Sequence, residues 1–259
     1  MGTAEGDGNM TAFGKKNAYQ GGAEESRAID VFLFWSEVPE DVRLAEILPR
    51  LDATERARAE RFRFPRDRNA FAIAHALLRH ALDAIAGVHP WHFAESSGGK
   101  PVIDAPGLPK LHFNLSHCRS MAAVAVCREA PVGVDVEVMD RTGGFEDMTS
   151  LVFAPSERTM LQSLQGDGWR EAFFTLWTLK EAAIKATGQG LSADLPGFAF
   201  AVDPPRLLTA GPDGRSADEW RFFSARVADC RLAAALPECC EKQVAFHLSK
   251  VAVTDLHGA

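Results

Sequence analysis

The sequence predicts an α+β fold built from two similar α+β halves, each a long helix packed on a small antiparallel sheet. Two long segments have the apolar period of an amphipathic helix, residues 68–87 (RNAFAIAHALLRHALDAIAG) and 170–188 (REAFFTLWTLKEAAIKATG). Short segments with strand-like alternation surround each of them, and their order in the first half recurs in the second. The 259 residues suit either one large domain or two small ones of about 100 to 150 residues.

In the first half, residues 30–35 (DVFLFW) predict a buried strand, and residues 40–62 show helical patterning broken near Pro49. Thr54 is the expected N-cap of a second helix, and Gly87 ends the long helix. Residues 111–117 (LHFNLSH) and 121–126 (MAAVAV) predict two strands joined by a turn.

The second half repeats this order. A strand (132–138, VGVDVEV) precedes a helix that Ser156 is expected to cap, and the long helix follows. Four more strands are predicted: residues 197–202, 220–227, 230–236 and 244–251. We therefore expect a disordered tail over residues 1–27, an N-terminal half over 28–130 and a C-terminal half over 131–259.

Aligning Gly87 with Gly188 places Arg79 opposite Lys180, which favours a duplicated unit. Two copies are too few for a solenoid, and chance similarity of two α+β segments is the alternative. If the halves meet across an interface, a cleft there is a favoured ligand site.

Composition narrows the function. A formal charge of −7 argues weakly against nucleic-acid binding, and the five scattered cysteines fit free thiols in a reducing compartment. No apolar run is long enough for a membrane span, and without a basic-then-apolar segment at the start we expect no signal peptide. We expect a cytoplasmic protein that binds neither nucleic acid nor membrane.

Two short motifs carry candidate chemistry. In GVDVE, period two places Asp135 and Glu137 on one face of a strand, where paired carboxylates suit Mg²⁺; an edge strand with a wet acidic face is the alternative. On the long helix, Trp177, Glu181 and Lys185 share one stripe, which indicates either a phosphate-handling cluster or ordinary ion pairs on a solvated face.

Together these motifs resemble the Sfp-type 4'-phosphopantetheinyl transferases, whose signature is G-x-D-x-E followed by W-x-x-K-E-x-x-x-K. The second part stands here as WTLKEAAIK, and GKP (99–101), FNLSH (113–117) and FAPSE (153–157) match in order and spacing. The resemblance spans roughly residues 30 to 250. It implies the fold of that family, with coenzyme A bound between the two halves.

The resemblance implies transfer of the 4'-phosphopantetheine arm of coenzyme A to a serine of an acyl or peptidyl carrier protein, with release of 3',5'-ADP. Mg²⁺, or Mn²⁺, would be held by Asp135, Glu137 and Glu181. Glu181 and Lys185 would be the catalytic residues, as base and as phosphate contact. The expected coenzyme A contacts are Arg58, Arg61, Lys100, Ser116, His117 and Lys185. The family habit implies a monomer.

Some positions depart from the family or stay open. Glu55 stands where relatives commonly have a basic residue, so Arg56 or Arg61 is a candidate substitute, and Cys118 stands where they often have serine. Residues 55–68 hold six arginines against Glu55, Glu60 and Asp67, which predicts either a basic patch that steers phosphates and acidic carriers or an ion-paired helix. The role of Lys180 stays open, and a structural one is possible.

Two rival functions come from other classes. One is a different Mg²⁺-dependent enzyme that acts on the phosphoanhydride of coenzyme A or a nucleotide without a carrier. The other is a non-catalytic binding protein with the same fold, which has no need of Glu181; the presence of all three carboxylates and both helix lysines favours an enzyme.

Overall fold

The computed structural model describes residues 28–95, 101–104, 107–140, 146–237 and 242–258. The expected tail over residues 1–27 lies outside this range. No helix in the described ranges combines the length and apolarity that a membrane crossing requires.

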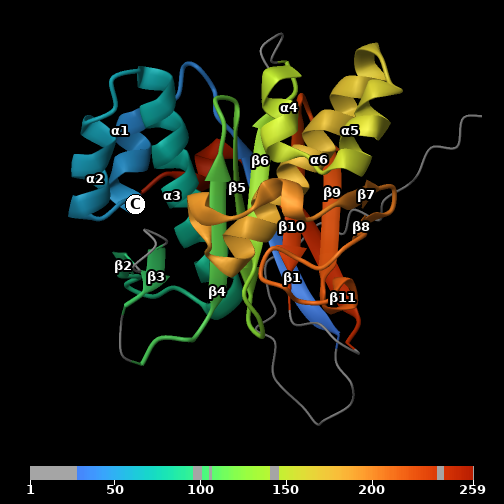
Figure 1. Ribbon diagram of the computed structural model, residues 1–259. Helices are drawn as coiled ribbons and strands as arrows, with labels where there is room; N and C mark the ends of the chain where they lie inside the picture. Colours follow the sequence, from blue (N-terminus) through green and yellow to red (C-terminus); the bar gives the residue numbers. More distant parts are fainter. Residues whose placement is uncertain (1–27, 96–100, 105–106, 141–145, 238–241, 259) are drawn as a thin grey trace, which may run out of the picture.

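The N-terminal half begins with strand β1 and three short helical segments, continues through the long helix α3, and ends with four strands (Figure 1). Its elements are β1 (Ile29–Glu37), α1 (Leu44–Ile47), η1 (Leu48–Arg50), α2 (Ala53–Glu60), α3 (Pro65–Ala86), β2 (Phe93–Glu95), β3 (Pro101–Ile103), β4 (His112–His117) and β5 (Met121–Cys127). Asp52, not Thr54, caps α2, because the helix begins at Ala53.

The C-terminal half repeats this order and adds a last strand. Its elements are β6 (Gly133–Val138), α4 (Glu146–Val152), α5 (Pro155–Gln162), α6 (Gly166–Thr187), η2 (Gly190–Ser192), η3 (Leu195–Gly197), β7 (Phe200–Val202), β8 (Pro205–Leu207), η4 (Ala217–Glu219), β9 (Arg221–Val227), β10 (Cys230–Leu236), β11 (Val244–Lys250) and η5 (Val253–Leu256). The helix expected to be capped by Ser156 begins at Pro155, so Ala154 is its N-cap.

The two sheets have the same strand order, which confirms the predicted duplication and fold class. β1-β5-β4 in the first half corresponds to β6-β10-β9 in the second, and all of these neighbours pair antiparallel. A two-stranded hairpin follows the long helix in each half, β2-β3 and β7-β8. The order of elements is thus the same in both copies.

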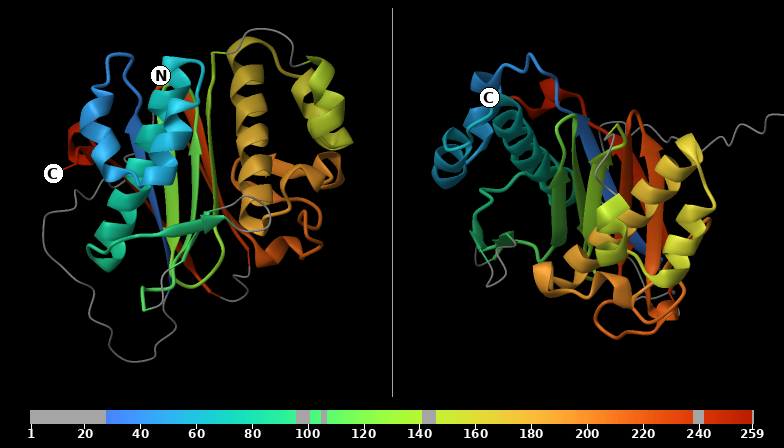
Figure 2. Two further views of the ribbon diagram at one scale, coloured as in Figure 1. Left: turned by 90° about the vertical axis from the view of Figure 1, so that its left-hand side faces the viewer. Right: turned by 45° about the horizontal axis from the view of Figure 1, so that its top comes forward.

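Alternate side chains along each strand face different cores, which places the sheets between the two long helices. In β1, Phe32 and Phe34 face the core against α3, whereas Val31 and Leu33 face a second core that the two sheets share. In the other half, Ala233 and Ala235 of β10 face α6, and the alternate residues face the shared core. The long helices therefore lie on opposite sides of the strands (Figure 1, Figure 2).

β11 departs from the predicted arrangement. It lies within residues 131–259, assigned from sequence to the C-terminal half, yet it pairs with β1 and runs parallel to it. The division predicted from sequence therefore does not follow the sheet at β11, which adds a parallel pairing to the antiparallel ones of the first half. The chain then ends beside the N-terminal helices, where the N–H of Gly258 donates to the carbonyl of Glu46 at 2.8 Å (Figure 2).

The two halves meet where β4 lies beside β6. We call this line of contact the seam. The N–H of Val134 in β6 donates across it to Oδ1 of Asn114 in β4 at 3.0 Å. Because the pair is buried, this hydrogen bond fixes the position of β4 along β6.

Candidate active site

The acidic strand β6 turns its carboxylates toward α6. Val134, Val136 and Val138 face the shared core, so period two directs Asp135 and Glu137 to the opposite face. Asp135 is buried and Glu137 is half-buried. The alternative of a fully wet acidic face on an edge strand is therefore excluded for Asp135.

Gly133 allows α6 to approach this strand closely. A Cβ atom at Gly133 would lie 2.0 Å from the carbonyl oxygen of Ala182 and 2.5 Å from the backbone nitrogen of Ala186. Side chains do not tolerate such distances, so only glycine fits here. The glycine of GVDVE thus brings the strand carboxylates and the last turns of α6 together.

The last turns of α6 supply Glu181 and Lys185. Both are half-buried and one turn apart, and the helix ends at Gly188, which has the left-handed conformation that favours glycine. Lys185 lies in the last turn, where the helix dipole favours a cation. The structure therefore brings both predicted catalytic side chains to the acidic face of β6.

A three-way contact joins these elements to β4. The ammonium of Lys185 donates to Oδ1 of Asp135 at 2.6 Å and to Oγ of Ser116 at 2.9 Å, and Ser116 itself donates to Oδ1 of Asp135 at 2.9 Å. Ser116 comes from the N-terminal half, and the other two from the C-terminal half. The cluster therefore straddles the seam, as expected for a site between two halves.

The second oxygen of Asp135 and the carboxylate of Glu181 both favour a cation. Oδ2 of Asp135 is buried and accepts no hydrogen bond from any described residue. Burial raises the pKa of Glu181, and the negative charge of Asp135 raises it further, against the opposing charge of Lys185. A bound cation would contact the unpaired oxygen of Asp135 and favour the charged form of Glu181, so the donor set fits Mg²⁺.

Within the described ranges, no three His, Cys, Asp or Glu side chains already lie close enough together to hold a metal ion. Lys185 is instead the cation in contact with Asp135. The predicted set of Asp135, Glu137 and Glu181 is brought to one face, and its use as a metal site remains a prediction.

His117 lies where the charges of both halves meet. Burial lowers its pKa to about 4, helped by the positive charges of His75, Lys185 and Arg58 and opposed by Asp67. The imidazole is therefore neutral near pH 7 and is surrounded by cations, as suits a site for phosphate. Arg58, on α2, also covers the ring of Phe71 at 5.4 Å.

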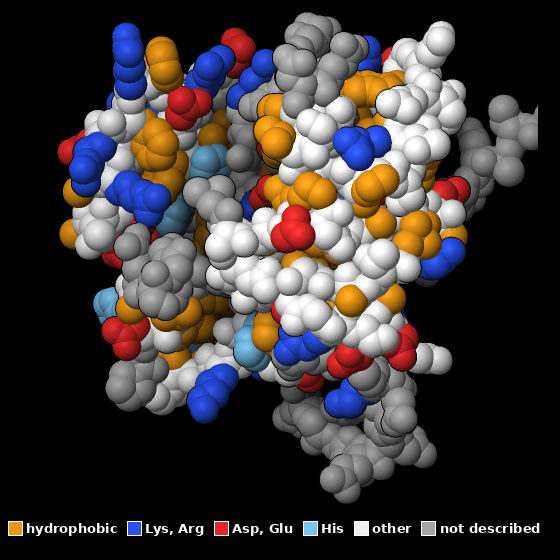
Figure 3. Space-filling model, in the orientation of Figure 1, with side chains coloured by type: hydrophobic (Ala, Val, Ile, Leu, Met, Phe, Trp, Pro, Cys, Tyr) orange, Lys and Arg blue, Asp and Glu red, His pale blue; other side chains and the backbone are white. Residues whose placement is uncertain are grey.

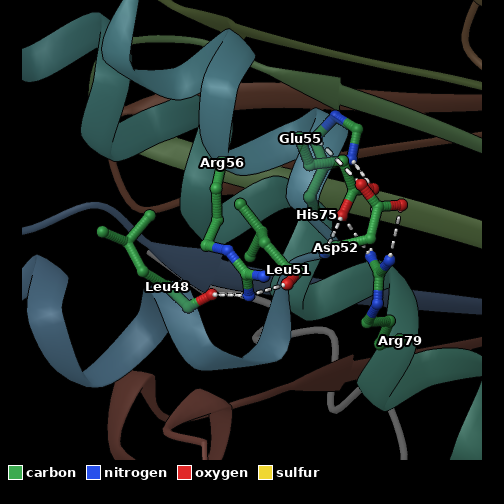
Figure 4. A network of polar contacts seen from close by, with 7 residues as sticks. All are labelled: Leu48, Leu51, Asp52, Glu55, Arg56, His75 and Arg79. Carbon is green, nitrogen blue, oxygen red and sulfur yellow. Dashed lines mark hydrogen bonds and ion pairs between the residues drawn. The ribbon is translucent and has the colours of Figure 1, made fainter.

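The arginines of residues 55–68 differ in whether they can face the hollow between the halves. Arginine side chains gather over the N-terminal helices beside a hollow between the halves in which histidine is visible (Figure 3). Arg56, however, turns back to the carbonyl oxygens of Leu51 at 2.6 Å and Leu48 at 3.5 Å (Figure 4), so it does not replace the basic residue missing at Glu55. Arg61 is exposed at the end of α2, and no described contact brings it to His117.

Glu55 has a structural role that explains the departure from the family. It is buried, accepts from His75 at 2.7 Å and pairs with Arg79 at 2.8 Å (Figure 4). Its carboxylate also closes a capping box with Asp52. Burial alone would raise the pKa of Glu55, but the hydrogen bonds and charges of His75 and Arg79 outweigh it and lower this pKa to about 2.

Lys180 has the matching role in the C-terminal half. Its ammonium is fully buried, pairs with Glu157 at 2.9 Å and donates to the carbonyls of Phe198 at 2.5 Å and Leu195 at 2.8 Å. Trp177 is half-buried and stacks on Phe173 with centroids 6.4 Å apart. Both side chains therefore belong to the core of this half rather than to the polar cluster.

Lys100 lies outside the described residues, so its predicted contact stays a prediction. Sequence reasoning missed two contributors to the site. Asn114 holds the backbone beside Asp135, and His75 contacts Glu55 while its positive charge lowers the pKa of His117. The motif FNLSH contained Asn114, but nothing in the sequence showed that its partner would be a backbone N–H of the other half.

Comparison with known proteins covers both halves. Residues 131–235 match the model of the 4'-phosphopantetheinyl transferase superfamily, and residues 35–129 match that of the 4'-phosphopantetheinyl transferase N-terminal domain. The two matches divide the chain between β5 and β6, close to the division drawn from the repeat.

Similar curated proteins bear the same name. The 4'-phosphopantetheinyl transferase HetI of Nostoc sp. is 36% identical over 65% of this chain and 73% of its own length. A 4'-phosphopantetheinyl transferase of Bacillus subtilis is 32% identical over 74% of this chain and 85% of its own length. The L-aminoadipate-semialdehyde dehydrogenase-phosphopantetheinyl transferase of Mus musculus is 29% identical over 67% of this chain and 62% of its own length.

Proposed function

The chain belongs to the 4'-phosphopantetheinyl transferase superfamily, and we propose that it transfers 4'-phosphopantetheine from coenzyme A to a serine of an apo acyl or peptidyl carrier protein. In this reaction 3',5'-ADP leaves, and Mg²⁺, or Mn²⁺, is required. The observation that supports it best is the Ser116–Asp135–Lys185 cluster across the seam, with Glu181 beside it.

We assign the metal to Asp135, Glu137 and Glu181. The buried Oδ2 of Asp135, without a hydrogen-bond partner among the described residues, is the strongest support for this assignment. When bound, the ion supplies charge neutralisation at the pyrophosphate of coenzyme A. Lys185, which contacts Asp135, would also offer its ammonium to phosphate oxygens, since an ammonium binds phosphate as a point charge.

Glu181 is the proposed base. Its raised pKa makes it more basic than an ordinary glutamate, so it is suited to take the proton of the attacking serine, directly or through a water. The carrier protein supplies the nucleophile. Ser116, His117, Arg58, Arg61 and Lys100 are assigned to the nucleotide and phosphates of coenzyme A, and they orient the pyrophosphate for attack.

The experiment mixes the protein with coenzyme A, Mg²⁺ and a panel of apo acyl and peptidyl carrier proteins. Intact-mass spectrometry should show one phosphopantetheine added per carrier, and none on a carrier whose acceptor serine is replaced by alanine. Chelation of divalent ions should stop the reaction and Mg²⁺ should restore it.

The alternative is a phosphoanhydride enzyme that cleaves coenzyme A or nucleotides without a carrier. The same reaction mixtures distinguish it, because 3',5'-ADP would then appear at equal rates with and without carrier. Measurable coenzyme A binding with no addition to any carrier would overturn the transfer proposal. We expect a monomer, because the two halves already form within one chain the interface that encloses the site.

A further inference from the structure

One face of β4 and its following turn carries a row of side chains that reach across the seam. Asn114 accepts the N–H of Val134, and two residues further Ser116 donates to Asp135. Two residues further again is Cys118, whose Sγ atom lies 3.8 Å from Sγ of Cys230 in β10. The third contact of this row is therefore a pair of thiols, one from each half.

The two thiols are held in place on both sides. The N–H of Cys118 donates to the carbonyl of Met121 at 2.9 Å, which closes the turn between β4 and β5. Oγ of Ser120 lies 3.4 Å from Sγ of Cys230, and Arg119 forms an ion pair with Asp140 across the same end of the seam. The short distance between the sulfurs is thus built into a turn and a hairpin.

The two thiols differ in accessibility and acidity. Cys118 is half-buried and Cys230 is fully buried. The hydrogen bond between the two thiols lowers the pKa of Cys118 to about 7, against the effect of burial, and hydrogen bonds with Ser120 act in the same direction. The hydrogen bond with Cys118 and burial instead raise the pKa of Cys230. Cys118 is therefore the thiol suited to react first, with Cys230 positioned to resolve the product.

We propose that Cys118 and Cys230 are a reversible oxidation site, which accepts a low-molecular-weight disulfide as oxidant and, when oxidised, links the two halves covalently beside the active site.

The chemistry balances in two exchanges. The Cys118 thiol loses its proton, attacks one sulfur of the disulfide and expels one thiolate, which takes up a proton. The Cys230 thiol then loses its proton and attacks Sγ of Cys118, expelling the second thiolate. Two protein thiols are oxidised to one disulfide, and the oxidant is reduced to two thiols.

Closure draws together two side chains that come from opposite sides of the seam. A disulfide has a sulfur–sulfur distance of about 2.05 Å, so the two sulfurs come closer by roughly 1.8 Å from their present 3.8 Å. Ser116 lies two residues away on the same face and contacts Asp135 and Lys185. Resting on the proposed function, we infer that the link displaces this cluster and weakens coenzyme A binding.

The first test maps the link without coenzyme A. The full chain carrying Cys239→Ser and Cys240→Ser is incubated with oxidised glutathione, alkylated and digested. We expect a peptide pair joined through Cys118 and Cys230, a mass loss of about 2 Da, and reversal by dithiothreitol. The linked protein should melt higher by roughly 5 °C or more, because the bond closes a long loop of the unfolded chain.

Cys118→Ser is the matched control, since it keeps a small polar side chain at the turn. It should form no link and show no rise in melting temperature with oxidant. Absence of the Cys118–Cys230 peptide in the parent, or a glutathione adduct on Cys118 that Cys230 never displaces, would overturn the proposal.

The second test measures coenzyme A affinity by calorimetry in the reduced and linked forms. We expect the Kd to rise several-fold on linkage and to recover on reduction, with no response in Cys118→Ser. An unchanged Kd in the fully linked protein would overturn the coupling to the site. Failure of the reduced protein to modify any carrier would instead overturn the proposed function, so the two failures are distinguishable.

Discussion

The two halves share a framework but fill it with different chemistry. Where β1 faces α3, the strand presents Phe32 and Phe34, and the ring of Phe34 meets His80 of the helix with centroids 6.4 Å apart. At the corresponding place in the C-terminal half, β6 presents Asp135 to Glu181 of α6, and the aligned long helices place Glu181 opposite His80. The N-terminal half thus has an apolar core at the place where the C-terminal half has the candidate active site.

The shared parts explain how this is tolerated. In each half the long helix sends a buried cation to a glutamate in the first turn of the preceding helix, Arg79 to Glu55 and Lys180 to Glu157. These pairs hold the helices in place independently of the strand–helix contact. The C-terminal copy can therefore place carboxylates at that contact, where we propose that a cation and a phosphate bind.

The largest effect is expected from neutralising the carboxylate of the active copy. Glu181→Gln keeps the shape of the side chain but removes the proposed base and one metal ligand, so the rate of carrier modification should fall on the order of 10³-fold. Initial rates followed by intact mass, with circular dichroism to confirm folding, provide the measurement.

His80→Gln is the matched control from the silent copy. It alters the corresponding helix position against Phe34, so the rate per folded molecule should stay within about twofold of the parent. Near-normal rates for Glu181→Gln would remove Glu181 from both proposed roles, and equal losses in both variants would place the effect in folding instead.

The two buried cations, Lys180 and Arg79, should contribute differently to the free energy of unfolding. Lys180→Met leaves Glu157 buried without its charged partner, which should lower the free energy of unfolding by about 3–5 kcal/mol. Arg79→Met leaves Glu55 with its contact to His75, so the loss should be smaller, about 1–3 kcal/mol. Urea unfolding measures both.

A rescue variant sharpens this comparison. Adding Glu157→Gln to Lys180→Met removes the unpaired charge and should recover part of the loss. If Lys180→Met and Arg79→Met cost the same, the second partner of Glu55 contributes nothing and the asymmetry between the pairs is wrong.

The close approach of β6 and α6 should depend on one missing methyl group. Gly133→Ala places a Cβ atom 2.0 Å from the Ala182 carbonyl, so strand and helix must separate, at a cost of about 2–3 kcal/mol in unfolding free energy. Gly168→Ala, in the first turn of α6 with open space around it, should instead gain up to about 1 kcal/mol. Chemical denaturation of both variants tests this, and equal stability would show that the contact at Gly133 relaxes freely.

Patterns local in sequence predicted much of this molecule. Apolar period identified both long helices, and alternation placed Asp135 and Glu137 on one face. What failed depended on contacts between distant segments: β11 crosses to the sheet of the first half, where it pairs with β1, and Glu55 is satisfied by His75 and Arg79 from another helix. A strand's pairing partner is not written in its own alternation.

The smallest expected effect compares two histidines whose pKa values are both lowered. Burial and the charge of Arg50 lower the pKa of His80 within the first half. Burial and the cations at the seam lower the pKa of His117 to about 4. A bound phosphate would favour the charged form of His117, so coenzyme A should raise its pKa by about 1 unit or more and leave His80 unchanged. By linkage, binding then takes up protons, and the affinity should strengthen as pH falls toward the His117 pKa. Proton NMR titration of both imidazoles, with and without coenzyme A, makes the measurement; equal shifts at the two rings would mean that the phosphates do not bind at the seam.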